Sequence, residues 1–160
     1  MRQTLRFALP AFLITMLALP TGVTGQLYTS IGAGVAAPIS DFGDVAGTGY
    51  TVRGQVGLSA IIVDAHIQGG WSRFSGEDFT VGGETVSGET ANVYHAGVGA
   101  RLGLGLIWVG ANGAYFFGDA DEGIGFFPEV GVGIGPIEVV ADIRIDGDQK
   151  WAAVRAALRF

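Results

Sequence analysis

The chain contains no cysteine, so no disulfide bond can stabilise it and no thiolate metal site can form. Beyond residue 25 it also lacks any run of 18 consecutive apolar residues, which excludes a transmembrane helix from that region. Basic residues are scarce, with 9 Lys and Arg against 15 Asp and Glu, for a formal net charge of −6. Nucleic-acid binding requires a basic surface and is therefore excluded as a function.

The N-terminal residues differ in character from the rest of the chain. Arg2 and Arg6 precede an uncharged apolar run over 7–20, and small polar residues follow it. This order is typical of a secretory signal peptide, so we expect residues 1–25 to be cleaved and residues 26–160 to form one exported domain. A membrane-anchor helix is the alternative, but the apolar run is short for a span, which needs about 20 residues.

Glycine is abundant, at 28 of 160 residues, whereas globular proteins contain about 7%. These glycines alternate with β-branched and aromatic residues rather than with Ser, Gln and Pro, which argues against a disordered segment. Within strands, glycine lets backbones approach closely and lets a small barrel curve. The composition therefore favours a β-structure with a crowded interior.

The last ten residues alternate strictly, with apolar side chains at even positions and both arginines at odd positions. Such a period of two indicates a β-strand with one apolar and one mixed face, and similar segments recur upstream. We predict eight strands, at about 27–37, 49–58, 61–73, 90–102, 105–117, 123–133, 136–145 and 149–160.

The predicted connections alternate between long and short. The long ones are 38–48, 74–89, 118–122 and 146–148, and the tight ones are 59–60, 103–104 and 134–135. Outer-membrane barrels have short periplasmic turns and longer external loops, whereas a soluble sandwich has no reason to sort loops in this way. The sequence thus predicts an all-β fold, an eight-stranded antiparallel up-and-down transmembrane β-barrel.

One face of every predicted strand is free of charge and would face lipid. Its aromatic residues fall mostly near strand ends, where membrane-interface girdles belong. They are Tyr50, Trp71, Tyr94, Tyr115, Phe117, Phe126 and Phe160. Pro128 does not fit this strand pattern, because proline cannot donate to a sheet ladder; it predicts either a bulge or a break in the sixth strand.

The opposite faces carry polar and charged side chains, and an eight-stranded barrel is only wide enough for side chains to fill it. We therefore predict a network of paired lumen charges that plugs the barrel, since a bare charge there costs several kcal/mol. The alternative is a narrow ion path between the charges. The predicted network comprises Arg53, Asp64, Arg101, Glu129, Glu138, Asp142, Arg144 and Arg155.

A catalytic or metal site has little support in the sequence. Asp64, His66 and His95 fall on inward faces, but their spacing matches no established ligand set, and no nucleophile elbow or HExxH motif is present. We expect no enzymatic activity, no metal and no cofactor.

Acidic residues gather in the longer connections. The compact group of Asp119, Asp121 and Glu122 could hold a hard cation weakly and so contact anionic lipopolysaccharide, or it could belong to a partner epitope. The simpler interpretation is that these acids form a solvated loop surface.

The chain resembles the small outer-membrane β-barrel family that includes OmpX-like proteins and the OmpA transmembrane domain. The resemblance rests on the Gly-rich first strand continuing into 34–44, on the alternation of loop lengths, and on the terminal strand ending in Leu158 and Phe160. It implies recognition of that strand by the barrel-assembly machinery. The residues so implicated are Val154, Ala156, Leu158 and Phe160.

These observations together predict a monomer in the bacterial outer membrane, in contact with lipid and lipopolysaccharide. Its role would be structural or interactive, through acidic external loops. Two alternatives stay open: a narrow porin-like channel for ions or small solutes, and a soluble periplasmic barrel that binds an apolar ligand. The soluble barrel would place its apolar side chains inside and its charges outside.

Overall fold

The computed structural model describes residues 25–39, 43, 46–76, 78–81, 84–119, 122–146 and 149–160. Residues 1–24, which include nearly all of the predicted signal peptide, lie outside this part of the chain. Among the described residues, no helix is long and apolar enough to cross a membrane. The strands are β1 Gln26–Ile39, β2 Ala46–Ala60, β3 Val63–Gly76, β4 Phe79–Val81, β5 Glu84–Val86, β6 Ala91–Leu104, β7 Ile107–Gly118, β8 Gly123–Ile134, β9 Ile137–Asp146 and β10 Gln149–Arg159.

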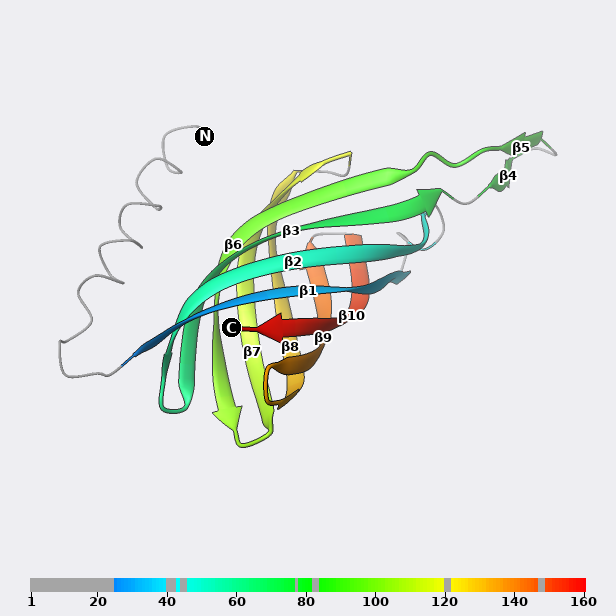
Figure 1. Ribbon diagram of the computed structural model, residues 1–160. Coiled ribbons are helices and arrows are strands. Elements are labelled where there is room, and N and C mark those ends of the chain that lie inside the picture. Colours follow the sequence, from blue (N-terminus) through cyan, green and yellow to red (C-terminus); the bar gives the residue numbers. More distant parts are fainter. Residues whose placement is uncertain are drawn as a thin grey trace, which may run out of the picture.

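Eight of these strands close into a single antiparallel barrel in the order β1-β10-β9-β8-β7-β6-β3-β2 (Figure 1). The seam between β1 and β10 pairs residues from Ser30 opposite Arg159 to Ile39 opposite Lys150. Thr29 and Phe160 extend the seam by exchanging two backbone hydrogen bonds, of 3.1 and 2.8 Å. The predicted eight-stranded up-and-down barrel is therefore confirmed.

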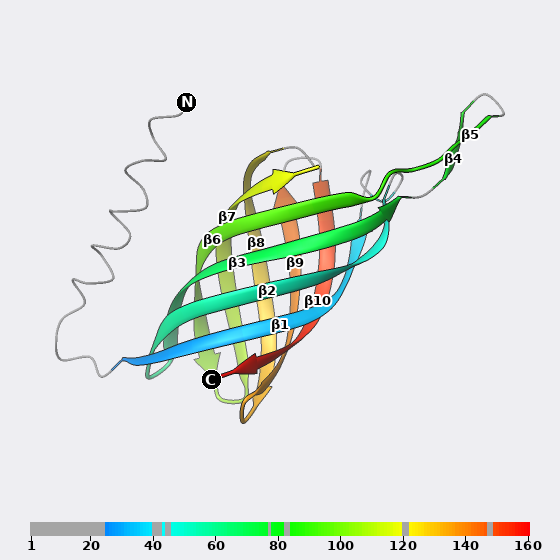
Figure 2. The same cartoon turned by 45° about the horizontal axis from the view of Figure 1, so that its top comes forward.

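The two ends of the barrel differ. At one end, which we call the turn end, two-residue turns join β2 to β3, β6 to β7 and β8 to β9, and the C-terminus lies there too (Figure 2). At the other, the loop end, three of the four connections are longer, and β9 and β10 are joined by only two residues, 147–148. There a short separate hairpin, β4–β5, projects beyond the barrel (Figure 1). The hairpin lies within the predicted connection 74–89, and its strands of three residues each are too short to be recognised in the sequence.

The tight turns lie one or two residues later than predicted. They are Ile61-Ile62, Gly105-Leu106 and Gly135-Pro136, and the first residue of each has a positive φ, of 50°, 87° and 61° respectively. A positive φ at that position is a property of the type II′ hairpin turn, whose twist matches the flanking strands. The first turn escaped prediction because Ile61 takes a position that glycine usually occupies.

Pro128 neither bulges nor breaks its strand, so both expectations for it were wrong. β8 runs unbroken from Gly123 to Ile134, and Pro128 pairs with Ala111 on β7. On the other side, the ladder with β9 omits Phe127 and Pro128 and resumes in the same register at Glu129. The missing N–H of Pro128 thus coincides with a two-residue gap in the β8–β9 ladder, while the β7–β8 ladder is continuous.

Alternate side chains point outward and inward along every barrel strand, as the period of two predicts. The outward positions form an exposed apolar surface, here called the wall; large members include Ile31, Val98 and Val130. The inward positions are mostly buried and many are polar. This arrangement is the reverse of the one expected for a soluble barrel with an apolar ligand inside.

The inward glycines make room for bulky lumen side chains on neighbouring strands. A Cβ atom built on Gly99, for example, would fall 2.6 Å from His66 Nε2 and still closer to Asn112 Oδ1. The abundance of glycine thus reflects the narrow interior as much as strand curvature. Directly opposed pairs of this kind are Tyr28–Gly57, His66–Gly99, His95–Gly70, Trp108–Gly131, Glu129–Gly110 and Arg155–Gly34.

We predict that Gly99→Ala lowers the free energy of unfolding by about 1–3 kcal/mol, because the added methyl group overpacks the lumen and displaces His66 or Asn112. Gly54→Ala is the matched control, since Gly54 faces outward and a Cβ there would meet nothing within 4 Å. Urea unfolding in detergent micelles measures both. Equal stability of the two variants would contradict the packing argument.

Candidate functional site

An ionic network occupies the middle of the lumen and is centred on Glu129 of β8. Its Oε2 accepts a 2.6 Å bond from Arg53 Nη2 on β2, and its Oε1 accepts a 3.0 Å bond from Arg101 Nε on β6. Because β2 and β8 lie opposite each other in the closed order, the Arg53 pair spans the barrel. The Glu129 side chain has no exposed surface, so both arginines hold it in a desolvated environment.

Arg101 extends this network toward the turn end with its remaining nitrogens. Nη1 donates to Glu138 at 3.2 Å, and Nη2 donates to Gln55 at 2.5 Å. Gln55 in turn donates to Gln68 at 3.2 Å. The Arg101 guanidinium also lies 3.9 Å from the Trp108 ring centre, which adds a cation–π contact. Every Arg101 nitrogen thus has an acceptor in the lumen.

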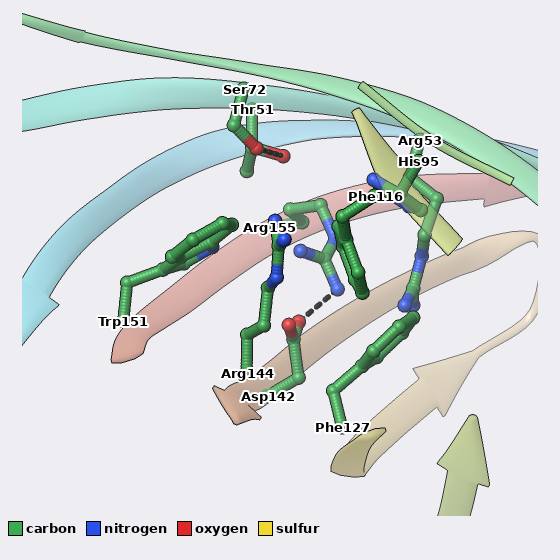
Figure 3. A pocket seen from close by; sticks show the side chains of 10 residues that line it. All are labelled: Thr51, Arg53, Ser72, His95, Phe116, Phe127, Asp142, Arg144, Trp151 and Arg155. Carbon is green, nitrogen blue, oxygen red and sulfur yellow. Dashed lines mark hydrogen bonds and ion pairs between the residues drawn. The ribbon is translucent and has the colours of Figure 1, made fainter. Parts of the chain in front are cut away.

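A second ionic group lies nearer the loop end (Figure 3). Arg155 donates to Asp142, while the Arg144 guanidinium lies against the rings of Phe116 and Trp151. The cavity among these side chains has a volume of about 10 Å³, which is room for one water molecule. Arg144 thus lies on the lumen face, as predicted from the period of two, and the rings of Phe116 and Trp151 are contacts that the prediction did not include.

The loop end of the lumen is closed by apolar side chains. Phe74 and Trp151 meet edge-on with ring centres 5.1 Å apart, and Phe116 meets Trp151 at 6.3 Å. Phe74 and Phe116 are almost completely buried. The whole cluster comprises Ala36, Ala46, Phe74, Val93, Ala114, Phe116, Phe127, Trp151 and Ala153.

The turn end of the lumen is open instead and forms a vestibule of about 300 Å³. Arg159 on β10 bridges two acids of the vestibule lining: it donates to Asp64 at 2.8 Å and to Glu138 at 3.4 Å. The same guanidinium lies 3.9 Å from the ring centre of Tyr28. The described residues thus give the lumen three zones: an open vestibule at the turn end, an ionic middle and an apolar cluster toward the loop end.

Asp64, His66 and His95 do not form a common site. Asp64 accepts from Arg159, whereas His66 Nε2 donates to Asn112 Oδ1 at 2.8 Å. His95 instead packs against Phe116 and Phe127, with ring centres 5.4 and 5.8 Å away. Among the residues that the structure describes, no group of three or more His, Cys, Asp or Glu side chains could hold a metal ion.

The loop acids have separate partners. Asp119 accepts from both the backbone N–H and the side-chain amide of Asn92, at 2.9 and 3.0 Å, and these bonds lower the pKa of its carboxyl group. Glu122 accepts from the Tyr115 hydroxyl at 3.0 Å. Asp121 lies outside the described residues. Asp119 thus links the end of β7 to the start of β6, and Glu122 links the residue before β8 to β7.

The wall aromatics lie mostly near the loop end. Tyr50 and Trp71 meet edge-on at 5.5 Å, while Tyr94 and Phe117 stack at 5.7 Å. Phe160 is the exception, since it ends β10 at the turn end. Two cations that sequence analysis did not single out, Arg73 and Lys150, occupy outward positions close to the loop end.

Sequence analysis also missed Arg159 as a lumen charge, although the alternation of the last strand puts it on the same face as Arg155. The aromatic residues of the lumen were not among the predicted interior groups either. The same period of two would have placed Tyr28, Trp108, Phe116 and Trp151 inside. The four outward residues of the proposed assembly signal, Val154, Ala156, Leu158 and Phe160, are exposed.

The geometry defines this chain as a closed, eight-stranded barrel with an apolar exterior and an ionic interior. Among solved structures it is similar to Neisserial surface protein A, with a TM-score of 0.52 and 14% identity over 83% of this chain and 95% of that one. A second similar structure is Ail, the attachment invasion locus protein of Yersinia pestis, with a TM-score of 0.49 and 12% identity over 85% and 99% of the two chains. No protein-family model and no curated protein matches the sequence. The similarity to Neisserial surface protein A confirms, at the level of the fold, the predicted resemblance to small outer-membrane barrels.

We predict that Glu129→Gln lowers the free energy of unfolding by about 3–5 kcal/mol, because it leaves Arg53 and Arg101 buried without their shared carboxylate. Glu122→Gln, at an exposed carboxylate just before the same strand, is the control and should change stability by about 0.5 kcal/mol or less. Urea unfolding in micelles compares the two. A Glu129 variant as stable as the control would show that the network adds nothing to stability.

Proposed function

We propose that the chain is an outer-membrane barrel protein whose lumen is plugged by its own side chains. The observation that carries this proposal is the inverted distribution of polarity. The wall is apolar, and Arg53, Arg101, Glu129 and Glu138 pair with one another inside. A closed barrel is the β-structure that a bilayer accepts, since it satisfies every backbone group internally. Export by a signal peptide over residues 1–25 is part of the proposal.

The plug favours a structural or interactive role over transport. The apolar cluster around Phe74, Phe116 and Trp151 closes the loop end, and the ionic network below it leaves a cavity of only about 10 Å³. The open vestibule at the turn end is the one feature that favours the alternative of a narrow channel. The proposed role therefore belongs to the loop end, where the β4–β5 hairpin projects and the acidic connections gather.

Lipopolysaccharide is the partner we propose for the loop end, alongside membrane lipid, with the barrel acting as a monomer. The aromatic girdle of Tyr50, Trp71, Tyr94 and Phe117 fits the headgroup level of the outer leaflet. Arg73 is exposed there and faces outward, where it can pair with an anionic headgroup. The acidic loops beyond it would approach the same headgroups through divalent cations.

Heat-modifiable migration and conductance test this proposal together. We expect the protein to fractionate with outer membranes, to shift in gel mobility on boiling, and to float with reconstituted vesicles. In planar bilayers, protein inserted in this way should give no current steps. Discrete steps from floating, folded protein would favour the channel, whereas detergent-free solubility of residues 26–160 would contradict the membrane assignment.

The proposed interaction with the assembly machinery is tested at the last residue. We expect Phe160→Ser to slow insertion into membranes that contain the barrel-assembly machinery and to leave spontaneous insertion into pure lipid vesicles nearly unchanged. Phe126→Ser removes another exposed wall aromatic on a different strand and serves as the control. Equal slowing by both variants would point to general lipid contact instead.

A further inference from the structure

The tight turns of this barrel are unusually apolar for segments that would stand in water. Ile61 is completely exposed, Leu106 is 66% exposed, and Ile134 is 72% exposed. Together these three hairpin ends, residues 60–63, 104–107 and 134–137, form with Phe160 a surface that we call the turn rim. Exposed apolar patches of this kind ordinarily mark contact with a membrane or with another protein.

The charged residues near the turn rim all point away from its outer surface. Asp64, Glu138 and Arg159 pair with one another inside the vestibule. The apolar wall therefore continues without a charge from the middle of the barrel onto the turns. At the loop end, by contrast, the outward positions include Arg73 and Lys150.

The backbone of the turn rim is also hydrogen-bonded in a way that suits lipid. The carbonyl of the second residue in each turn accepts a bond from an N–H of the next strand around the barrel. The three bonds are Gly103 to Ile62 at 2.7 Å, Gly133 to Leu106 at 2.8 Å and Arg159 to Pro136 at 2.7 Å. In water such carbonyls could bond to solvent, but in hydrocarbon they need a partner within the protein.

The side chain at position 61 supports the same conclusion. A β-branched residue with φ of 50° is a backbone outlier, and glycine or asparagine would adopt this conformation more easily. Both would expose more polar surface than isoleucine does. Ile61 therefore suits an apolar surrounding better than it suits the turn itself.

The distribution of wall aromatics points the same way. Interface girdles mark the levels at which a barrel wall leaves hydrocarbon for headgroups. Tyr50, Trp71, Tyr94, Tyr115 and Phe117 mark such a level near the loop end, whereas Phe160 is the one described wall aromatic near the turn end. Near the turn end the apolar wall runs to the last residue of each hairpin.

We propose that the turn rim is a lipid-binding surface, immersed in the inner leaflet rather than projecting into the periplasm. This inference rests on the proposed membrane location and adds the depth at which the barrel sits. The occupant of the rim is the lipid that already surrounds the wall, because the two surfaces are continuous. The vestibule then opens at the level of lipid headgroups.

The absence of cysteine allows this proposal to be tested with single spin labels and no background. Ile62→Cys and Leu106→Cys place a nitroxide on two turns of the rim. Val130→Cys labels the middle of the wall, and Glu89→Cys labels the exposed loop end. Each variant is reconstituted into phosphatidylethanolamine–phosphatidylglycerol vesicles, and collision rates with oxygen and with a water-soluble nickel chelate are measured by EPR.

We expect the rim labels to match Val130, with high oxygen and low nickel accessibility, and to differ from Glu89. Rim labels that match Glu89 would overturn the proposal while leaving the membrane location intact. Low accessibility to both reagents would overturn it in favour of a protein or a second copy covering the rim. A Val130 label that reads as aqueous would instead contradict the membrane location itself.

Discussion

The carboxylate of Glu129, shared between Arg53 and Arg101, is the contact on which the interior depends. It joins three strands, two of which face each other across the barrel, and neither oxygen has access to solvent. An isolated charge in this space would be costly, so each lumen charge needs a partner. The lumen therefore gathers the polar side chains that can pair there, while the outward positions of the strands stay apolar.

A crowded interior explains why this chain carries so much glycine. His66, His95, Trp108 and Glu129 each lie opposite a glycine on a neighbouring strand. Without that space, the aromatic and guanidinium groups could not pack in a barrel of eight strands. Glycine thus serves packing here at least as much as it serves backbone conformation.

The period of two predicted much of this structure because it governs each strand independently of its neighbours. It placed Arg53, Arg101 and Glu129 on inward faces and Val139 and Ile143 on outward ones. It could not tell which groups would meet, because those contacts depend on strand order and stagger. The pairing of Arg53 with Glu129 across the barrel and the contacts of Arg144 with Phe116 and Trp151 are examples.

Turn positions were predicted less well, for a reason that the hairpins show. Ile61-Ile62 has no glycine, asparagine or aspartate to mark a turn, and the apolar pattern of the strands runs straight through it. The β4–β5 hairpin was missed because its strands are too short to establish a period. Sequence patterns therefore miss a turn that lacks the usual turn residues, and they miss a hairpin whose strands are too short to show a period.

The placement of two arginines on the final strand has a consequence for how the fold is completed. Arg155 and Arg159 pair with Asp142 and Asp64, the second of these partners lying 95 residues earlier in the chain. The Arg155–Asp142 pair can form within the β9–β10 hairpin, but Asp64 on β3 gains Arg159 only when β10 docks against β1. If the seam slipped by two residues, or if the barrel closed with one strand too few, Asp64 would lie inside the barrel without its cation. The Arg159–Asp64 pair therefore links the formation of a lumen ion pair to closure of the barrel with this strand number and stagger.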